Sequence, residues 1–138
     1  MSYKLLEHAT DAFVEITASD LKEAFIQAGY SVVETTLERE TIEEKEERII
    51  SVKGKDLKYL LFNWLEEVIF QLITEGFAIH RFKIELKKGI EYEIISTLYG
   101  EPINLQKHHF KVEIKAPTFH LMEIVEGKKV LMRFLLDL

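Results

Sequence analysis

The clearest pattern along the chain is a stripe of apolar residues at helical spacing near its middle. The stripe lies between Asp56, a good helix N-cap, and Gly76, a residue type that often ends helices. Its members recur every three or four residues, as one buried helix face requires: Leu57, Leu60, Leu61, Trp64, Leu65, Val68, Ile69 and Leu72. The spacing therefore predicts a helix with Leu61 and Trp64 in the core.

A second amphipathic stripe predicts an earlier helix that begins at Asp20. Asp20 and Glu23 have the spacing of a capping box. Both helices open with the same Asp-Leu-Lys tripeptide, and each follows a short alternating segment, 12–17 in one case and 49–53 in the other. This repetition suggests a strand, turn and helix unit used twice. The buried stripe of the earlier helix consists of Leu21, Ala24, Phe25, Ala28 and Val32.

The second half of the chain alternates apolar and polar residues, which is typical of strands. Segments 81–87 and 90–94 flank a turn at Lys88 and Gly89 and predict a hairpin, while 110–116 and 130–136 predict two further strands. The resulting fold class is α+β, with two helices packed on a mostly antiparallel or mixed β-sheet. We expect one compact domain over residues 1–138, and the Glu-rich segment 34–48 should be a solvated edge or loop.

The composition argues against a membrane protein, a tight nucleic-acid binder and a disulfide-linked or thiolate metal protein. The 138 residues are 47% hydrophobic, which suffices for a single core, and no apolar run approaches the roughly 20 residues of a membrane helix. With 18 Lys and Arg against 24 Asp and Glu, the net charge of −6 argues against tight direct binding to nucleic acid. There is no cysteine, which excludes disulfides and thiolate metal sites. We expect a cytoplasmic protein without membrane association.

Catalytic motifs are absent from the sequence, since it has neither a phosphate-binding glycine loop nor a hydrolase-like order of Ser, His and Asp. The polar residues at predicted sheet ends are His8, Asp11 and Asp137, the last of which precedes Leu138. Two carboxylates and a main-chain oxygen are ligands suited to Ca²⁺ or Mg²⁺. Residue types alone leave the ordinary alternatives open, namely that Asp11 caps a turn and Asp137 is a solvated terminal charge.

Several segments, taken together and in order, resemble the archease family. They are the opening Glu7-His8-Ala9-Thr10-Asp11, the tract 60–68 with Trp64-Leu65-Glu66, Gly100-Glu101 with the later His108, the segment Glu113-Ile114-Lys115-Ala116-Pro117-Thr118-Phe119-His120, and the ending Leu136-Asp137-Leu138. The resemblance extends over essentially the whole chain. Pro117 departs from it, and because proline cannot donate to a sheet, it predicts an edge strand or a bulge.

The resemblance implies a protein cofactor rather than an enzyme, with no catalytic residues of its own. Archeases activate a GTP-dependent tRNA-splicing RNA ligase, which joins 3′-phosphate or 2′,3′-cyclic phosphate ends to 5′-hydroxyl ends, by promoting its guanylylation and multiple turnover. The family's metal ligands would fall on Asp11, Asp137 and Leu138, the last through a carbonyl or carboxylate oxygen. The implied metal is Ca²⁺, with Mg²⁺ or Mn²⁺ as alternatives.

Two other functions compete with this interpretation. A chaperone-like interaction module that assists an RNA-modifying tRNA methyltransferase would need an exposed apolar patch. A small metal-dependent hydrolase would need an open metal position with a general base nearby, and no residue stands out as that base.

Overall fold

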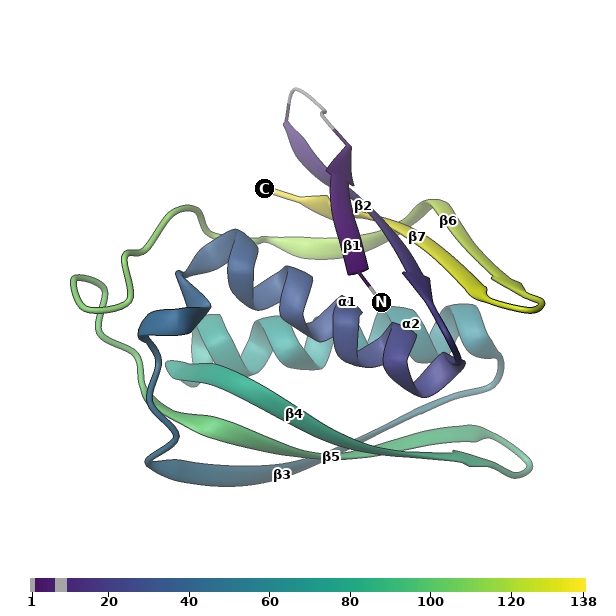
Figure 1. The fold of residues 1–138 in the computed structure, drawn as a ribbon, viewed down its shortest axis with the longest axis horizontal. Coiled ribbons are helices and arrows are strands. Elements are labelled where there is room, and N and C mark those ends of the chain that lie inside the picture. The colour runs from purple at the N-terminus through teal and green to yellow at the C-terminus, as the bar shows by residue number, and fades with distance from the viewer. Residues whose placement is uncertain (1, 7–9) are drawn as a thin grey trace.

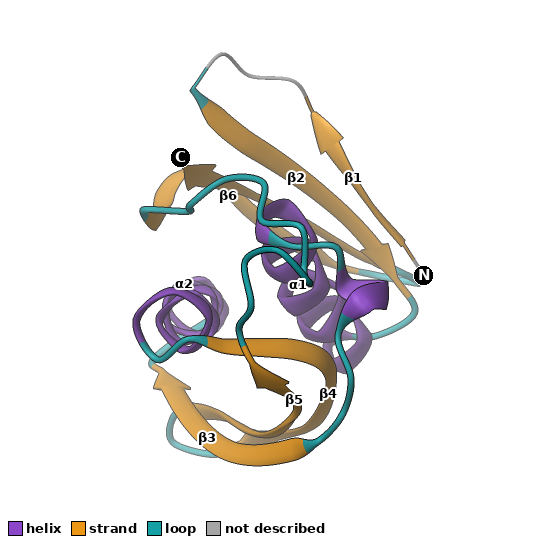
Figure 2. Cartoon of the chain, turned by 90° about the vertical axis from the view of Figure 1, so that its left-hand side faces the viewer, coloured by secondary structure: helices purple, strands orange, loops and turns teal. Residues whose placement is uncertain are grey.

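Two α-helices lie between two β-sheets in the computed structural model, which describes residues 2–6 and 10–138 (Figures 1 and 2). One sheet has four strands in the order β1-β2-β7-β6, and the other has three in the order β3-β5-β4. All the recorded strand pairs are antiparallel. The elements are β1 (Ser2–Leu6), β2 (Asp11–Ala18), α1 (Leu21–Thr36), β3 (Glu46–Gly54), α2 (Leu57–Ile69), β4 (Phe77–Lys88), β5 (Tyr92–Pro102), β6 (Ala116–Glu126) and β7 (Val130–Asp137).

Both helices begin where the sequence predicts. The Asp20 carboxylate accepts a hydrogen bond from the Glu23 backbone N–H, and the Asp56 carboxylate accepts one from the Tyr59 backbone N–H, each at 2.9 Å. Each cap therefore satisfies one of the unpaired N–H groups at a helix start. Helix α2 continues into a π-helical turn at Phe70–Thr74, after which Gly76 adopts a φ of 61° and ends the helical segment.

The core lies between the sheets and takes in the inner faces of both helices. Leu61 and Trp64 are fully buried, as the apolar stripe predicts. The Trp64 indole N–H donates to the backbone oxygen of Phe25 on α1 at 2.9 Å, and its ring packs edge-on against Phe82 of β4 at 5.4 Å. Trp64 thus joins both helices to the three-stranded sheet. These elements confirm the α+β class, although the helices are covered by two sheets rather than resting on one.

The predicted strand at 110–116 is wrong for residues 110–115. These residues belong to a connection, 103–115, that runs from β5 to β6 (Figure 1). His109 has a φ of 53°, which extended strands do not adopt, and the Lys111 backbone N–H donates to Thr36 O at the end of α1. The apolar residues of this segment do not share one buried face, because Ile114 is buried in the core while Phe110 is exposed. Ile90, predicted to open a strand, lies fully exposed in the β4–β5 turn.

Strands β4 and β5 approach each other very closely at one point. A β-bulge shifts the register between Ile79 and Arg81, and a Cβ atom added to Gly100 would lie only 1.8 Å from the backbone oxygen of Ala78. Glycine is therefore required there, and it sets the position of the next residue, Glu101, at the end of β5. In the part of the chain that the structure describes, no helix is long and apolar enough to cross a membrane.

Candidate functional site

The first candidate residues, Asp11 and Asp137, come from opposite ends of the chain and meet in the four-stranded sheet. Strand β2 pairs with β7, and Asp11 is the direct cross-strand partner of Asp137. The predicted juxtaposition of the two residues is confirmed. Their neighbours Ala12 and Leu136 are buried against the helices, so the alternation of strand side chains places both aspartates on the outer face of the sheet.

Backbone hydrogen bonds hold this end of the sheet together. The Lys115 N–H donates to Asp137 O at 2.8 Å, and the Leu138 N–H contacts Thr10 O at 3.4 Å. We call Asp11, Asp137 and Leu138 the acidic tip. Of the other residues that the sequence singles out near it, Glu7, His8 and Ala9 lie outside the described residues.

The donor atoms at the acidic tip suit a hard cation only in part. Cross-strand neighbours have Cβ atoms about 4.5–5.5 Å apart, so both carboxylates can reach one ion, and Leu138 adds a main-chain oxygen. Ca²⁺ takes about six to eight oxygens, however, and within the described residues no group of three His, Cys, Asp or Glu side chains is placed to hold a metal. The described residues of the tip therefore supply fewer oxygen ligands than Ca²⁺ takes.

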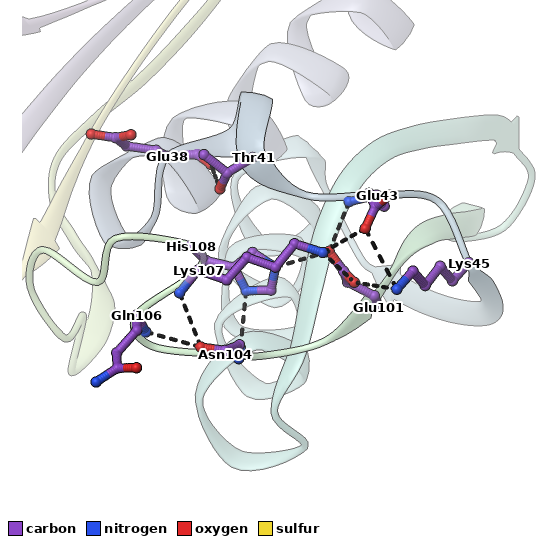
Figure 3. Close-up of polar contacts among 9 residues, drawn as sticks. All are labelled: Glu38, Thr41, Glu43, Lys45, Glu101, Asn104, Gln106, Lys107 and His108. Carbon is purple, nitrogen blue, oxygen red and sulfur yellow. Dashed lines mark hydrogen bonds and ion pairs between the residues drawn. The ribbon is translucent and has the colours of Figure 1, made fainter.

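A second polar cluster, which the sequence did not reveal as a unit, surrounds the carboxylate of Glu101 (Figure 3). Glu101 is only 4% exposed, and its carboxylate accepts hydrogen bonds from the Glu43 backbone N–H at 2.8 Å and from Lys107 Nζ at 3.0 Å. His108, fully buried, lies with Nε2 at 2.9 Å from the same carboxylate. Glu43 and Lys45 lie at the exposed edge of this cluster, where Lys45 forms ion pairs with Glu43 and Glu101, and Lys107 forms one with Glu43.

The hydrogen bonds assign the tautomer of His108. Its Nδ1 accepts a hydrogen bond from the Asn104 backbone N–H at 3.0 Å, so the ring proton lies on Nε2 and is donated to Glu101. Burial raises the pKa of Glu101, but the hydrogen bonds from Glu43 N–H, His108 and Lys107, with the Lys107 charge, outweigh it and lower that pKa to about 2. Glu101 is therefore ionised at neutral pH, and its carboxylate accepts the hydrogen bonds that hold the cluster together.

The cluster fastens the 103–115 connection, which leads directly to the acidic tip. The Asn104 side chain accepts from the N–H groups of Gln106 and Lys107 and closes a tight turn, while His108 O accepts from Glu38 N–H. The connection then reaches the tip, where the Lys115 N–H donates to Asp137 O. The signal in the sequence was the Asn104 turn followed by two histidines, but nothing in the spacing indicates that His108 faces Glu101.

Fold and site together define a small α+β protein in which two helices lie between antiparallel sheets and two aspartates meet at the strand ends. The profile of the Archease protein family matches residues 3–138. The chain belongs to the archease family.

Individual relatives agree with this assignment. The protein archease of Pyrobaculum islandicum is 38% identical over 126 residues, which cover 90% of this chain and 86% of that protein. The archease-like protein of Drosophila melanogaster is 34% identical over 128 residues, covering 91% and 81%. The solution structure of protein 1598 of Methanobacterium thermoautotrophicum matches with a TM-score of 0.85 at 30% identity and covers 99% of both chains.

Proposed function

We propose that this chain activates a GTP-dependent tRNA-splicing RNA ligase, that it promotes the ligase's guanylylation and repeated turnover, and that it is not itself an enzyme. Family membership supports a role in RNA processing alongside a ligase. The observation that carries the proposal is the direct cross-strand pairing of Asp11 with Asp137. We propose the cytoplasm as the site of action.

The two aspartates would hold a divalent cation, Ca²⁺ first and Mg²⁺ or Mn²⁺ as alternatives, together with a main-chain oxygen of Leu138. Such an ion would offset negative charge on a phosphoryl group in transfer. The chain's own contribution is orientation: the β2–β7 ladder fixes both carboxylates on one outer face, and the Lys115 N–H holds the backbone of Asp137. Because an open site leaves coordination positions unfilled, groups of the partner can share the ion.

The test compares Asp11→Ala and Asp137→Ala with a matched control, Glu85→Ala. Glu85 is an exposed acid on β4, in the other sheet, so the control removes the same charge away from the tip. Each protein is added to the purified ligase of the same source, and two quantities are measured: labelled GMP transferred to the ligase, and moles of RNA joined per mole of ligase. Thermal melts without metal show whether each variant is folded.

We expect both tip variants to melt like the wild type and to lose stimulation, because removing one of two adjacent carboxylates relieves repulsion when no cation is bound. The control should stimulate normally. Full stimulation by both folded tip variants would contradict the proposed role of the tip. No stimulation by the wild type would contradict the proposed function itself.

A further inference from the structure

Three aromatic side chains, two exposed and one partly buried, form a cluster where helix α2 packs against strand β6. The Phe62 and Phe119 rings stack in parallel, with centroids 4.3 Å apart and planes 6° apart, and the Tyr59 ring tilts against Phe119 at 5.0 Å. Tyr59 is 42% exposed and Phe119 is 43% exposed. We call Tyr59, Phe62, Phe119 and the neighbouring Leu121 the aromatic shelf. Large apolar side chains gathered in this way on a surface are typical of binding sites.

The backbone of β6 is distorted at the shelf. The register with β7 shifts between Thr118 and Glu123, and Leu121 adopts a φ of 60°, a conformation that is unfavourable for leucine. Leu121 is 50% exposed, whereas Met122 beside it is buried. The distorted segment therefore leaves the apolar side chain of Leu121 exposed. Local strain of this kind is common at binding sites.

Two lysines lie beside the shelf in a chain whose net charge is −6, and the exposed Glu66 lies one helical turn beyond Phe62. Lys55 Nζ lies 4.3 Å from the centre of the Tyr59 ring, and Lys58 is exposed one position before Tyr59 on α2. The acid between these lysines, Asp56, is already bound to the Tyr59 backbone N–H as the helix cap. An apolar surface beside two lysines is complementary to an apolar side chain flanked by carboxylates.

The same features favour a protein over single-stranded RNA as the occupant. Bases bind such clusters by stacking on open ring faces. Here Phe62 covers one face of Phe119, and the Lys55 ammonium lies over one face of Tyr59. The net negative charge of the whole chain also repels a phosphate backbone, whereas the local lysines suffice to attract a few carboxylates.

We propose that the aromatic shelf is a docking surface for an acidic segment of the partner protein that inserts an apolar side chain beside Phe119 and Leu121. The inference rests on the proposed function, because it assigns the shelf to the same ligase that the acidic tip serves. Ala116 of β6 pairs with Asp137, and Phe119 follows three residues later, which corresponds to about 10 Å along a strand. The two sites are therefore close along β6, with the tip on the outer face of the sheet and the shelf on the side where α2 packs.

The experiment measures the dissociation constant of the purified ligase for two kinds of shelf variant. Phe119→Ala removes the central ring, and the double variant Lys55→Glu with Lys58→Glu reverses the charges while it keeps all three rings and Leu121. Ile49→Ala is the matched control, since Ile49 is 72% exposed on β3 of the other sheet. A 12-nucleotide single-stranded RNA is titrated in parallel, and stimulation of RNA joining is measured at rising concentrations of each variant.

We expect both shelf variants to bind the ligase at least tenfold more weakly, and the control to bind within twofold of the wild type. At saturating concentration the shelf variants should restore full stimulation, because docking rather than the tip is impaired. Unchanged ligase affinity for the double variant, with normal stimulation by the wild type, would overturn the docking proposal and leave the proposed function intact. Loss of RNA binding with unchanged ligase binding would overturn it in favour of an RNA surface.

Discussion

Trp64 illustrates how a single buried side chain can satisfy both its apolar and its polar parts. The ring is fully buried against Phe82, and its one N–H group is paired with a carbonyl oxygen of the neighbouring helix. A buried indole without such a partner would lose the hydrogen bond that its N–H makes with water in the unfolded chain.

Trp64→Ala should therefore destabilise the fold by about 3–5 kcal/mol, through the cavity left by the ring and the loss of the hydrogen bond to the Phe25 oxygen. Chemical denaturation followed by circular dichroism gives the free energy of unfolding. Ile90→Ala is the control, because Ile90 is fully exposed in a turn, and its denaturation midpoint should stay within error of the wild type. A midpoint for Trp64→Ala that matched the control would contradict the position of Trp64 in the core.

The low pKa of Glu101 predicts how the stability of the fold depends on pH. Its pKa in the folded chain is about 2 and its usual value is 4.5, so the carboxylate stabilises the fold fully above about pH 4.5, and this contribution is lost as the pH falls toward 2. Glu101→Gln should lower stability at neutral pH, and the difference from the wild type should shrink between pH 4.5 and 2. Glu44, whose pKa is also about 2, is present in both proteins and cancels in the comparison.

Urea denaturation of the two proteins at a series of pH values measures this difference. A difference in the free energy of unfolding that stayed constant from neutral pH to pH 2 would show that the charge of Glu101 does not stabilise the cluster.

At the scale of single residues, the sequence predicted the buried position of Trp64, which follows from local spacing, and missed the pairing of Glu101 with His108. That pairing depends on how one connection folds back, and no periodic pattern encodes it.

Elements as a whole were predictable where one face is buried over several turns or strand positions. Helix α2 has such a face, and its start and stop residues agree with the stripe. Residues 110–115 show how the same reasoning fails, because their alternation is short and their backbone groups bind the end of α1 instead of a neighbouring strand. Strand β1 was not predicted, since five residues carry too little pattern to identify a strand.

The close approach of β4 and β5 leads to a test at the level of the sheet. Gly100→Ala should destabilise the protein by about 3 kcal/mol, since the new methyl group would meet the Ala78 carbonyl and force the strands apart. Gly127→Ala is the matched control: an added Cβ there would lie 3.7 Å from the nearest heavy atom, an ordinary contact. Thermal melts that gave equal midpoints for the two variants would contradict the tight bulge.

Across the whole molecule, the acidic tip joins the two ends of the chain. Its existence followed from the resemblance to a family rather than from spacing, because no local signal relates residue 11 to residue 137. The sheet order explains the meeting physically: β2 and β7 are neighbours, so their ends must coincide when eight residues of each strand pair in register.

A cation shared by these ends should stabilise the entire fold. At a calcium concentration 100 times its dissociation constant, binding to the native state alone would add about 2.7 kcal/mol. We expect calcium to raise the melting temperature of the wild type, EDTA to reverse the increase, and Asp11→Asn to abolish it. Glu85→Gln should respond as the wild type does, and an equal rise in Asp11→Asn would place calcium elsewhere.

The β2–β7 pairing also has a consequence for how the chain is made. Strand β2 is synthesised about 110 residues before β7, which at about 5–20 residues per second amounts to roughly 6–22 s of waiting. During that time the edge of β2 that will receive β7 has no partner, and such an edge invites pairing with other chains. A product cut short before residue 130 would keep this edge permanently, so incomplete chains would lack the acidic tip and would be prone to aggregate.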